Sequence, residues 1–150
     1  MSFFTLKTIA LLSMLYDHIA YVWPAVAFGW APEPLQQGLH YLGRIAAPIF
    51  LFSIANGYRH TRSVRRYALR LLLFACLAEQ PYYWLFGDHG NILFTLLLGL
   101  LALRLLDWGN KCRPGLGHLA AGLLVVLAEV LALSEGKGRY ILFILAFYLT

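Results

Sequence analysis

Long apolar runs recur along this chain and constrain its fold more than any other feature. A helix needs about 20 predominantly apolar residues to cross a hydrocarbon core of ~30 Å. The runs that approach this length are residues 5–23, 41–58, 67–86, 92–107 and 116–133, and a further run over residues 140–150 is still apolar at the last residue. The pattern predicts an all-α, polytopic transmembrane helix bundle of five to six spans. We expect a single domain over residues 1–150, truncated within its sixth helix.

The composition excludes an ordinary soluble domain. Hydrophobic residues make up 61% of the chain and charged residues 13%, and the mean hydropathy is +0.68, which is more apolar side chain than a soluble fold can bury. The first run has the length of a signal peptide. A signal core would not contain Asp17 and His18, however, and no small-residue cleavage site follows, so we expect a retained first helix.

The basic residues report topology rather than nucleic-acid binding, although the net charge is +5. They concentrate between apolar runs, with four arginines in residues 57–66 and three basic residues in 104–113. The positive-inside rule makes both loops cytoplasmic. Counting spans backward places the N-terminus in the cytoplasm and residues 24–40, 87–91 and 134–139 on the outer side of a bacterial inner membrane. Cys76 and Cys112 have no spacing partner, so neither a disulfide nor a metal site is predicted.

The first run carries ionisable residues, which cost several kcal/mol each in hydrocarbon and are therefore functional candidates. Lys7 and His18 are eleven positions apart, almost three helical turns, so they share one helix face roughly 16 Å apart along the axis. Asp17 lies beside His18, and the other runs place polar residues at a similar depth, in the outer half of the bilayer. These polar residues are Arg44, Glu79, Gln80, Asn91, Thr95 and Glu129. The residues expected around the cytoplasmic mouth are Lys7, Arg59, His60, Arg62, Arg65, Arg66 and Arg70.

Structural interpretations compete with functional ones for these residues. The arginines of the 59–70 stretch also serve as topology determinants, and Arg44 can snorkel or pair with Asp17. Buried polar pairs such as Asp17 and His18 also pack membrane helices. Histidines at loop ends need no explanation beyond hydration, and these are His40, His89 and His118. His18 differs because a histidine beside a carboxylate can shuttle protons near neutral pH.

Several short motifs, in order along almost the whole chain, resemble the signatures of the TraX family, which is named for a conjugative-pilus protein that acetylates the pilin N-terminus. They are Leu6-Lys7-x-x-Ala10-Leu11-x-x-Met14-x-x-Asp17-His18, Leu42-Gly43-Arg44-Ile45-Ala46-x-Pro48-Ile49-Phe50, Asn56-Gly57-Tyr58-x-His60-Thr61-Arg62, Tyr67-x-x-Arg70-Leu71, Gln80-Pro81 and Asn91-Ile92-Leu93-Phe94-Thr95-Leu96-x-x-Gly99. The spacing of Lys7 and His18 is also similar to a pattern of the broader acyltransferase-3-like membrane acyltransferases, in which that histidine is regarded as catalytic. The chain departs from the family at Ser134–Gly138, where an Asp-Tyr-Gly segment is expected, and in lacking the C-terminal helices.

The resemblance implies an acyltransferase that uses acetyl-CoA or another acyl-CoA from the cytosol and needs no metal. Its acceptor would be an amine or hydroxyl of a pilin-like protein, a glycan or a lipid, within surrounding membrane lipids. His18 would be the general base, Asp17 or Glu79 would orient it, and oxyanion donors would be Arg44, Asn91 or Thr95. The donor phosphates would bind Lys7, Arg59, Arg62, Arg66 and Arg70.

Two other functions fit the same residues. A non-enzymatic membrane scaffold would use the polar residues to hold a pilin or another helix. A transporter fragment would use the outer polar cluster as an ion or proton site.

Overall fold

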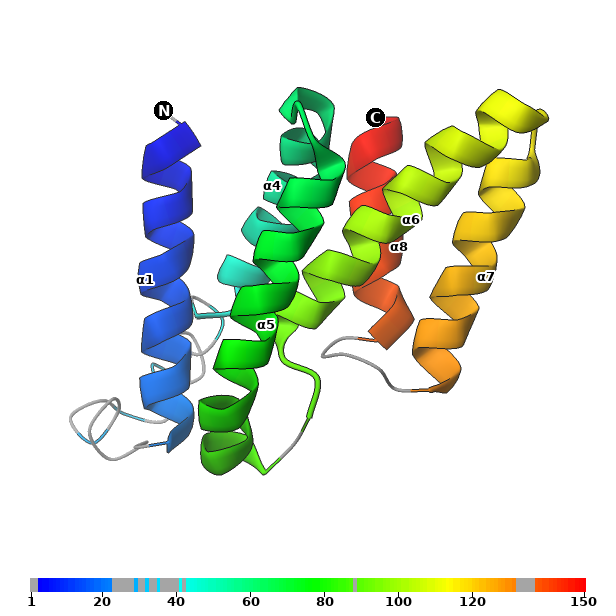
Figure 1. Ribbon diagram of the computed structural model, residues 1–150. Coiled ribbons are helices and arrows are strands. Elements are labelled where there is room, and N and C mark those ends of the chain that lie inside the picture. Colours follow the sequence, from blue (N-terminus) through cyan, green and yellow to red (C-terminus); the bar gives the residue numbers. More distant parts are fainter. Residues whose placement is uncertain are drawn as a thin grey trace. The chain divides into compact units, whose positions relative to one another are not determined.

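The regular secondary structure is helical throughout the residues that the computed structural model describes, which are 3–22, 29, 32, 35, 41, 43–87, 89–131 and 137–150 (Figure 1). The all-α prediction is therefore confirmed. The helices are α1 (Phe3–Val22), α4 (Ala46–His60), α5 (Val64–Phe86), α6 (Ile92–Cys112), α7 (Leu116–Val130) and α8 (Lys137–Leu149). Each corresponds to one predicted apolar run. Most of the predicted outer loops 24–40 and 134–139 lies outside the described residues.

Local chemistry explains where the helices begin and end. The second helix was predicted to run from about residue 41, and Tyr41 and Gly43 are helical, but Arg44 and Ile45 form a turn, so α4 itself begins at Ala46. Pro48 accounts for this start: it has no N–H for a helical bond to residue 44, and proline is tolerated in a first turn. At the other end of the next helix, Gly87 adopts φ 70° and donates its N–H to the Tyr83 carbonyl, which closes α5.

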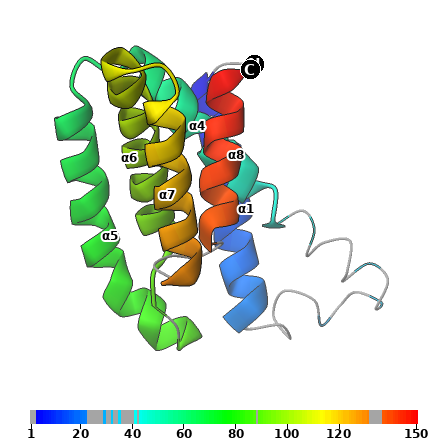
Figure 2. The same cartoon turned by 90° about the vertical axis from the view of Figure 1, so that its right-hand side faces the viewer.

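The chain forms two compact units, Met1–Phe50 and Leu51–Thr150. Helix α6 is the centre of the second unit, because it packs against α5, α7 and α8. Figure 1 shows α6 running obliquely between α5 and α7, and Figure 2 shows α7 and α8 side by side. The residues buried between α6, α7 and α8 are Ala102, Val125, Ala128 and Ile141.

One described helix, α6, is long and apolar enough to cross a membrane, while α7 and Gly138–Leu149 are apolar but shorter. Helix α1 has 20 residues and α5 has 23, but polar residues lower their hydropathy. The multi-span arrangement therefore stays a prediction.

Helix α7 faces its neighbours with small residues and exposes large ones. Gly117 and Ala121 are buried, whereas Leu119, Leu123 and Val130 are 73%, 70% and 74% exposed. A soluble helix places its large apolar side chains inward. Small residues at the contact and large apolar residues outside are typical of helices packed within a bilayer.

Close approach of α6 and α7 depends on Gly117. A Cβ built there would lie 2.0 Å from the backbone oxygen of Leu106, whereas a Cβ at Gly122 would meet nothing within 4 Å. We expect Gly117→Ala to lower the free energy of unfolding by about 1–3 kcal/mol, because the helices must move apart. Gly122→Ala, on the same helix, should leave it unchanged or raise it by up to ~1 kcal/mol. Unfolding of both variants in detergent micelles, followed by circular dichroism, measures this difference, and equal effects would contradict the packing argument.

Candidate functional site

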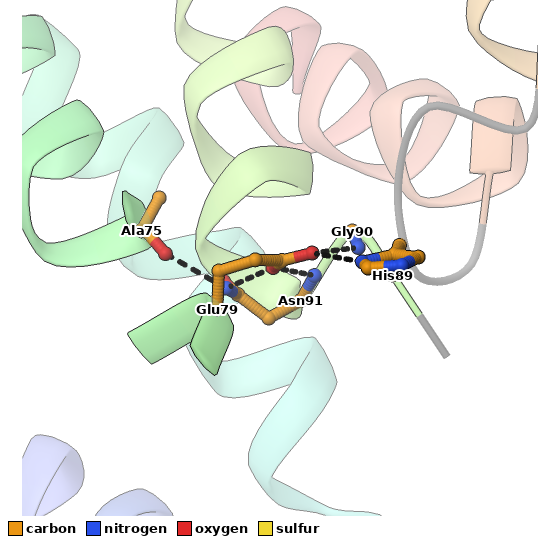
Figure 3. Close-up of polar contacts among 5 residues, drawn as sticks. All are labelled: Ala75, Glu79, His89, Gly90 and Asn91. Atoms are coloured by element: carbon orange, nitrogen blue, oxygen red, sulfur yellow. Dashed lines mark hydrogen bonds and ion pairs between the residues drawn. The ribbon is translucent and has the colours of Figure 1, made fainter. Parts of the chain in front are cut away.

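The carboxylate of Glu79 is the centre of a hydrogen-bonded network at the junction of α5 and α6 (Figure 3). One carboxylate oxygen accepts from Gly90 N at 2.9 Å and lies 3.2 Å from His89 Nδ1. The other accepts from Asn91 N at 3.3 Å and from Asn91 Nδ2 at 2.8 Å. Four donors therefore converge on Glu79, which fixes its position in the site.

Asn91 ties this network to both helices. Its Oδ1 accepts from Leu93 N at 3.0 Å and so caps α6, while its Nδ2 also donates to the Ala75 carbonyl of α5 at 2.9 Å. Asparagine is a favoured N-cap because its side-chain oxygen satisfies an N–H at the start of the helix. Both N–H groups of the Asn91 amide are used inside the network. Asn91 thus positions Glu79 in this structure, and its amide does not offer a donor to an oxyanion.

The turn before α6 brings the donors to Glu79. Gly90 has φ 84°, a left-handed conformation that glycine adopts without steric cost, and its N–H points at the carboxylate. His89 precedes it, with a side chain 73% exposed. The His89 ring stacks on Tyr83 with centroids 4.5 Å apart and planes at 12°. The histidine that contacts Glu79 is thus His89, which the sequence left as a hydrated loop residue.

A second polar cluster joins α4, α6 and α8. The Asp107 carboxylate accepts from Tyr58 Oη at 2.8 Å and from Tyr148 Oη at 3.1 Å. The two tyrosine rings meet edge to face at 5.5 Å. Arg59 donates to the Tyr148 carbonyl and lies over the Tyr148 ring. This cluster fastens the C-terminal helix to α4 and α6, with the cation of Arg59 at the favourable C-terminal end of α8.

A groove of about 630 Å³ lies between α5 and α6. Its polar lining is Arg62, Arg65 and Arg104, and no lining residue in the described part of the chain is acidic. Its apolar lining comprises Val64, Ala68, Leu69, Leu72, Leu97 and Leu101. Because α5 and α6 run in opposite directions, Arg104 falls opposite Arg62 and Arg65. The apolar lining extends from there by about seven residues of α5, or ~10 Å.

The residues predicted to bind the donor are divided by this geometry. Arg62 lines the groove, whereas Arg66 and Arg70 do not and lie ~100° and ~140° around α5 from Arg65. Arg59 is engaged with Tyr148. Lys7 belongs to the first unit, where its Nζ lies 4.7 Å from the centre of the Phe3 ring. Arg65 and Arg104 also line the groove, although the sequence did not place them in the donor set. Each lies three or four residues from a groove leucine, Leu69 or Leu101, and this helical spacing could have identified them as neighbours on one helix face.

His18 lies in the first unit, near the end of α1. Its Nδ1 is 2.8 Å from the Met14 carbonyl, so the neutral ring carries its proton on Nδ1 and its basic lone pair on Nε2. Asp17 packs against Gly43, where an added Cβ would lie 2.6 Å from Asp17 Oδ1. Ser13 Oγ donates to the Gly43 carbonyl at 3.0 Å. These contacts hold Gly43, which directly precedes the turn of Arg44 and Ile45, against the same part of α1 that carries His18.

The predicted catalytic residues thus fall into two groups. Asp17, His18 and Arg44 belong to the unit 1–50, and Glu79, Asn91 and Thr95 to the unit 51–150. Within the second group, Glu79 and Asn91 are hydrogen-bonded, and Thr95 is fully buried one turn further along α6. No cluster of three or more metal-binding side chains occurs among the described residues.

Comparison with known proteins gives a family match and one named relative. The family model described as TraX protein matches residues 2–150. A probable fimbrial assembly protein FimC, serogroup H1, from Dichelobacter nodosus is 34% identical over 117 residues. That alignment covers 69% of this chain and 46% of the relative, so this chain matches about half of that protein. No solved structure matches the chain.

Proposed function

The chain belongs to the TraX family, and from this we propose that it is a membrane-embedded acyltransferase. It would transfer an acyl group, in the first instance acetyl, from a cytosolic acyl-CoA to an amine or hydroxyl. The relative is described as a fimbrial assembly protein, which favours the N-terminus of a pilin-like subunit as the acceptor.

The groove between α5 and α6 is the observation that carries this proposal. Guanidinium groups of Arg62, Arg65 and Arg104 gather at one end of it, and arginine is well suited to phosphate because its planar fork donates two parallel hydrogen bonds. An acyl-CoA combines phosphates with a long, less polar arm that ends in the thioester. The apolar lining beyond the arginines suits that arm, and three cations without a lining acid favour an anionic ligand.

The exposed surface of the second unit supports an inner-membrane, multi-pass location. Leu73, Phe74 and Leu77 on α5 are 58%, 58% and 63% exposed, and α7 exposes a similar apolar face. Water around these faces would cost about 25 cal/mol for each Å² of apolar surface, a cost that lipid chains remove. Membrane lipids are therefore the proposed surroundings, with the Arg62 end of the groove toward the cytoplasm.

The proposed chemistry assigns the proton transfer to His18. The acceptor nitrogen attacks the thioester carbonyl carbon, a C–N bond forms, and the nitrogen gives a proton to His18 Nε2. The C–S bond then breaks, and His18 returns the proton to the departing CoA sulfur. Asp17 beside His18, and Arg44 as an oxyanion donor, keep their proposed roles because they share a unit with His18.

Binding of acetyl-CoA to the purified protein in detergent tests the donor site. We expect Arg62→Gln, Arg65→Gln and Arg104→Gln each to weaken binding roughly tenfold, because each removes one charge-assisted contact to phosphate. Binding should also weaken as salt rises. Isothermal titration calorimetry at two salt concentrations measures both effects.

Arg66→Gln and Arg70→Gln are the matched controls, because they remove the same charge from other faces of α5. Binding should change by no more than about twofold, as expected for remote surface charges. Equal losses in all five variants would mean that net charge, not the groove, attracts the donor. A folded wild-type protein that binds no acyl-CoA would exclude the acyltransferase and favour the scaffold.

A further inference from the structure

His89 and Glu79 form a carboxylate–histidine pair that the proposed transfer step does not use. Nδ1 of His89 lies 3.2 Å from Glu79 Oε1, and the ring stacks on Tyr83 (Figure 3 shows the first contact). Two contacts therefore fix the orientation of a ring that is 73% exposed. Ordering an exposed side chain costs conformational entropy. A histidine that is both fixed and exposed is therefore a candidate for proton transfer.

Glu79 acts in this pair only through His89. Its two oxygens already accept from Gly90 N, Asn91 N and Asn91 Nδ2, and its side chain is 25% exposed. With these donors and His89 in place, it has little capacity left for a ligand. His89 contacts Glu79 through Nδ1, so the neutral ring carries its proton on Nδ1 and Nε2 is its basic nitrogen.

An amine acceptor needs a basic residue that removes a proton from it before the transfer step. A peptide α-amino group has a pKa of about 7.7–8.0, so near pH 7 it is mostly ammonium and cannot attack a thioester. The overall reaction, ammonium plus acyl-CoA giving amide plus CoA thiol, releases one proton. We infer that His89, oriented by Glu79, takes this proton from the ammonium of the acceptor on the predicted outer side of the membrane and passes it to water. The inference rests on the proposed function and adds a site for preparing the acceptor.

The proton balance distinguishes His89 from His18. His89 Nε2 removes the first proton and leaves a neutral amine. The second proton leaves the nitrogen during attack and reaches the CoA sulfur as the C–S bond breaks, which is the role proposed for His18. Glu79 and Tyr83 both face His89.

Acyl transfer by the whole protein in detergent, with acetyl-CoA as donor, tests this role through two acceptors. One is a peptide with a free α-amino group, and the other is hydroxylamine, which is already neutral at pH 7. We expect His89→Gln to slow transfer to the peptide by about 15- to 30-fold at pH 6.5, which is the ratio of total to neutral α-amino group at that pH. The deficit should close above about pH 9, where the α-amino group is neutral without help. Transfer to hydroxylamine should be unchanged.

His118→Gln, at an exposed histidine of α7, is the matched control and should resemble the wild type. Added imidazole should restore peptide acylation to His89→Ala, which a purely structural role would not allow. A His89→Gln protein that matches the wild type at pH 6.5, or that is equally slow with both acceptors at every pH, overturns the inference alone. No transfer by the wild type to either acceptor overturns the proposed function, and with it this role of His89.

Discussion

Replacing His18 by glutamine is expected to lower the rate of acyl transfer roughly 10²- to 10⁴-fold, the range that general-base catalysis supplies. Glutamine can still donate a hydrogen bond but cannot take up a proton at neutral pH. Binding of acetyl-CoA should be unchanged, because the proposed donor groove lies between α5 and α6, with none of its lining from α1. Single-turnover acylation, measured beside donor binding, separates these two effects.

His60 provides a matched control for His18. Each histidine has Nδ1 2.8 Å from the carbonyl four residues earlier, Met14 for His18 and Asn56 for His60. If the effect of His18→Gln came only from loss of that backbone contact, His60→Gln would lower the rate of acyl transfer to a similar extent. We expect His60→Gln to retain full activity. A His18→Gln protein that stays active would remove His18 from the mechanism, and one that unfolds would make it a packing residue.

The helices were predictable from sequence because apolar periodicity and length act locally. The interruption of the second predicted helix at Arg44 and Ile45 was missed; α4 begins at Ala46, and Pro48, which has no N–H, lies in its first turn. The extension of α6 to Cys112 was missed because the run of polar residues after Leu106 looked like a loop. Packing against α7, through Gly109 and Gly117, keeps that end helical despite its composition.

The candidate site was predictable only in part, because side-chain partners depend on tertiary contacts. Glu79 and Asn91 were both singled out for their depth in the bilayer, and they are hydrogen-bonded. Their partner His89 was overlooked because an exposed loop histidine has no distinctive sequence signal. Glu129, in contrast, accepts from Gly138 N at 2.9 Å and so caps the start of α8, a structural role that depth alone does not reveal.

The Asp107 cluster shows why polar residues near helix ends are difficult to interpret. Asp107 lies three residues after Arg104 on α6, a spacing that favours an ion pair along the helix. The structure instead places Tyr58 and Tyr148 on the Asp107 carboxylate. Arg104 lines the groove and hydrogen-bonds the Tyr58 side chain. Two tyrosines from distant parts of the sequence thus decide the partners of these charged residues, and no local pattern contains that information.

Replacing Asn91 by alanine is expected to lower the free energy of unfolding by roughly 2–5 kcal/mol. The Asn91 side chain is buried, caps α6 through Leu93 N, and donates to Glu79 and the Ala75 carbonyl. Loss of an N-cap costs about 0.5–2 kcal/mol, and loss of a hydrogen bond to a charged group costs about 1.5–3 kcal/mol. Denaturant unfolding in micelles, with the linear extrapolation of the free energy, measures the effect.

Two further variants distinguish the stability contributed by this hydrogen-bonded network from the effect of removing any amide side chain. Gln80→Ala removes an exposed amide side chain from α5 and should change the free energy of unfolding by less than about 0.5 kcal/mol. Asn91→Asp keeps an oxygen to cap Leu93 N but puts a second carboxylate against Glu79, where like charges repel. It should therefore be no more stable than Asn91→Ala at pH 7. If Asn91→Asp were as stable as the wild type, the Nδ2 contacts would contribute little, and Glu79 would be held in place by the backbone N–H groups of Gly90 and residue 91 alone.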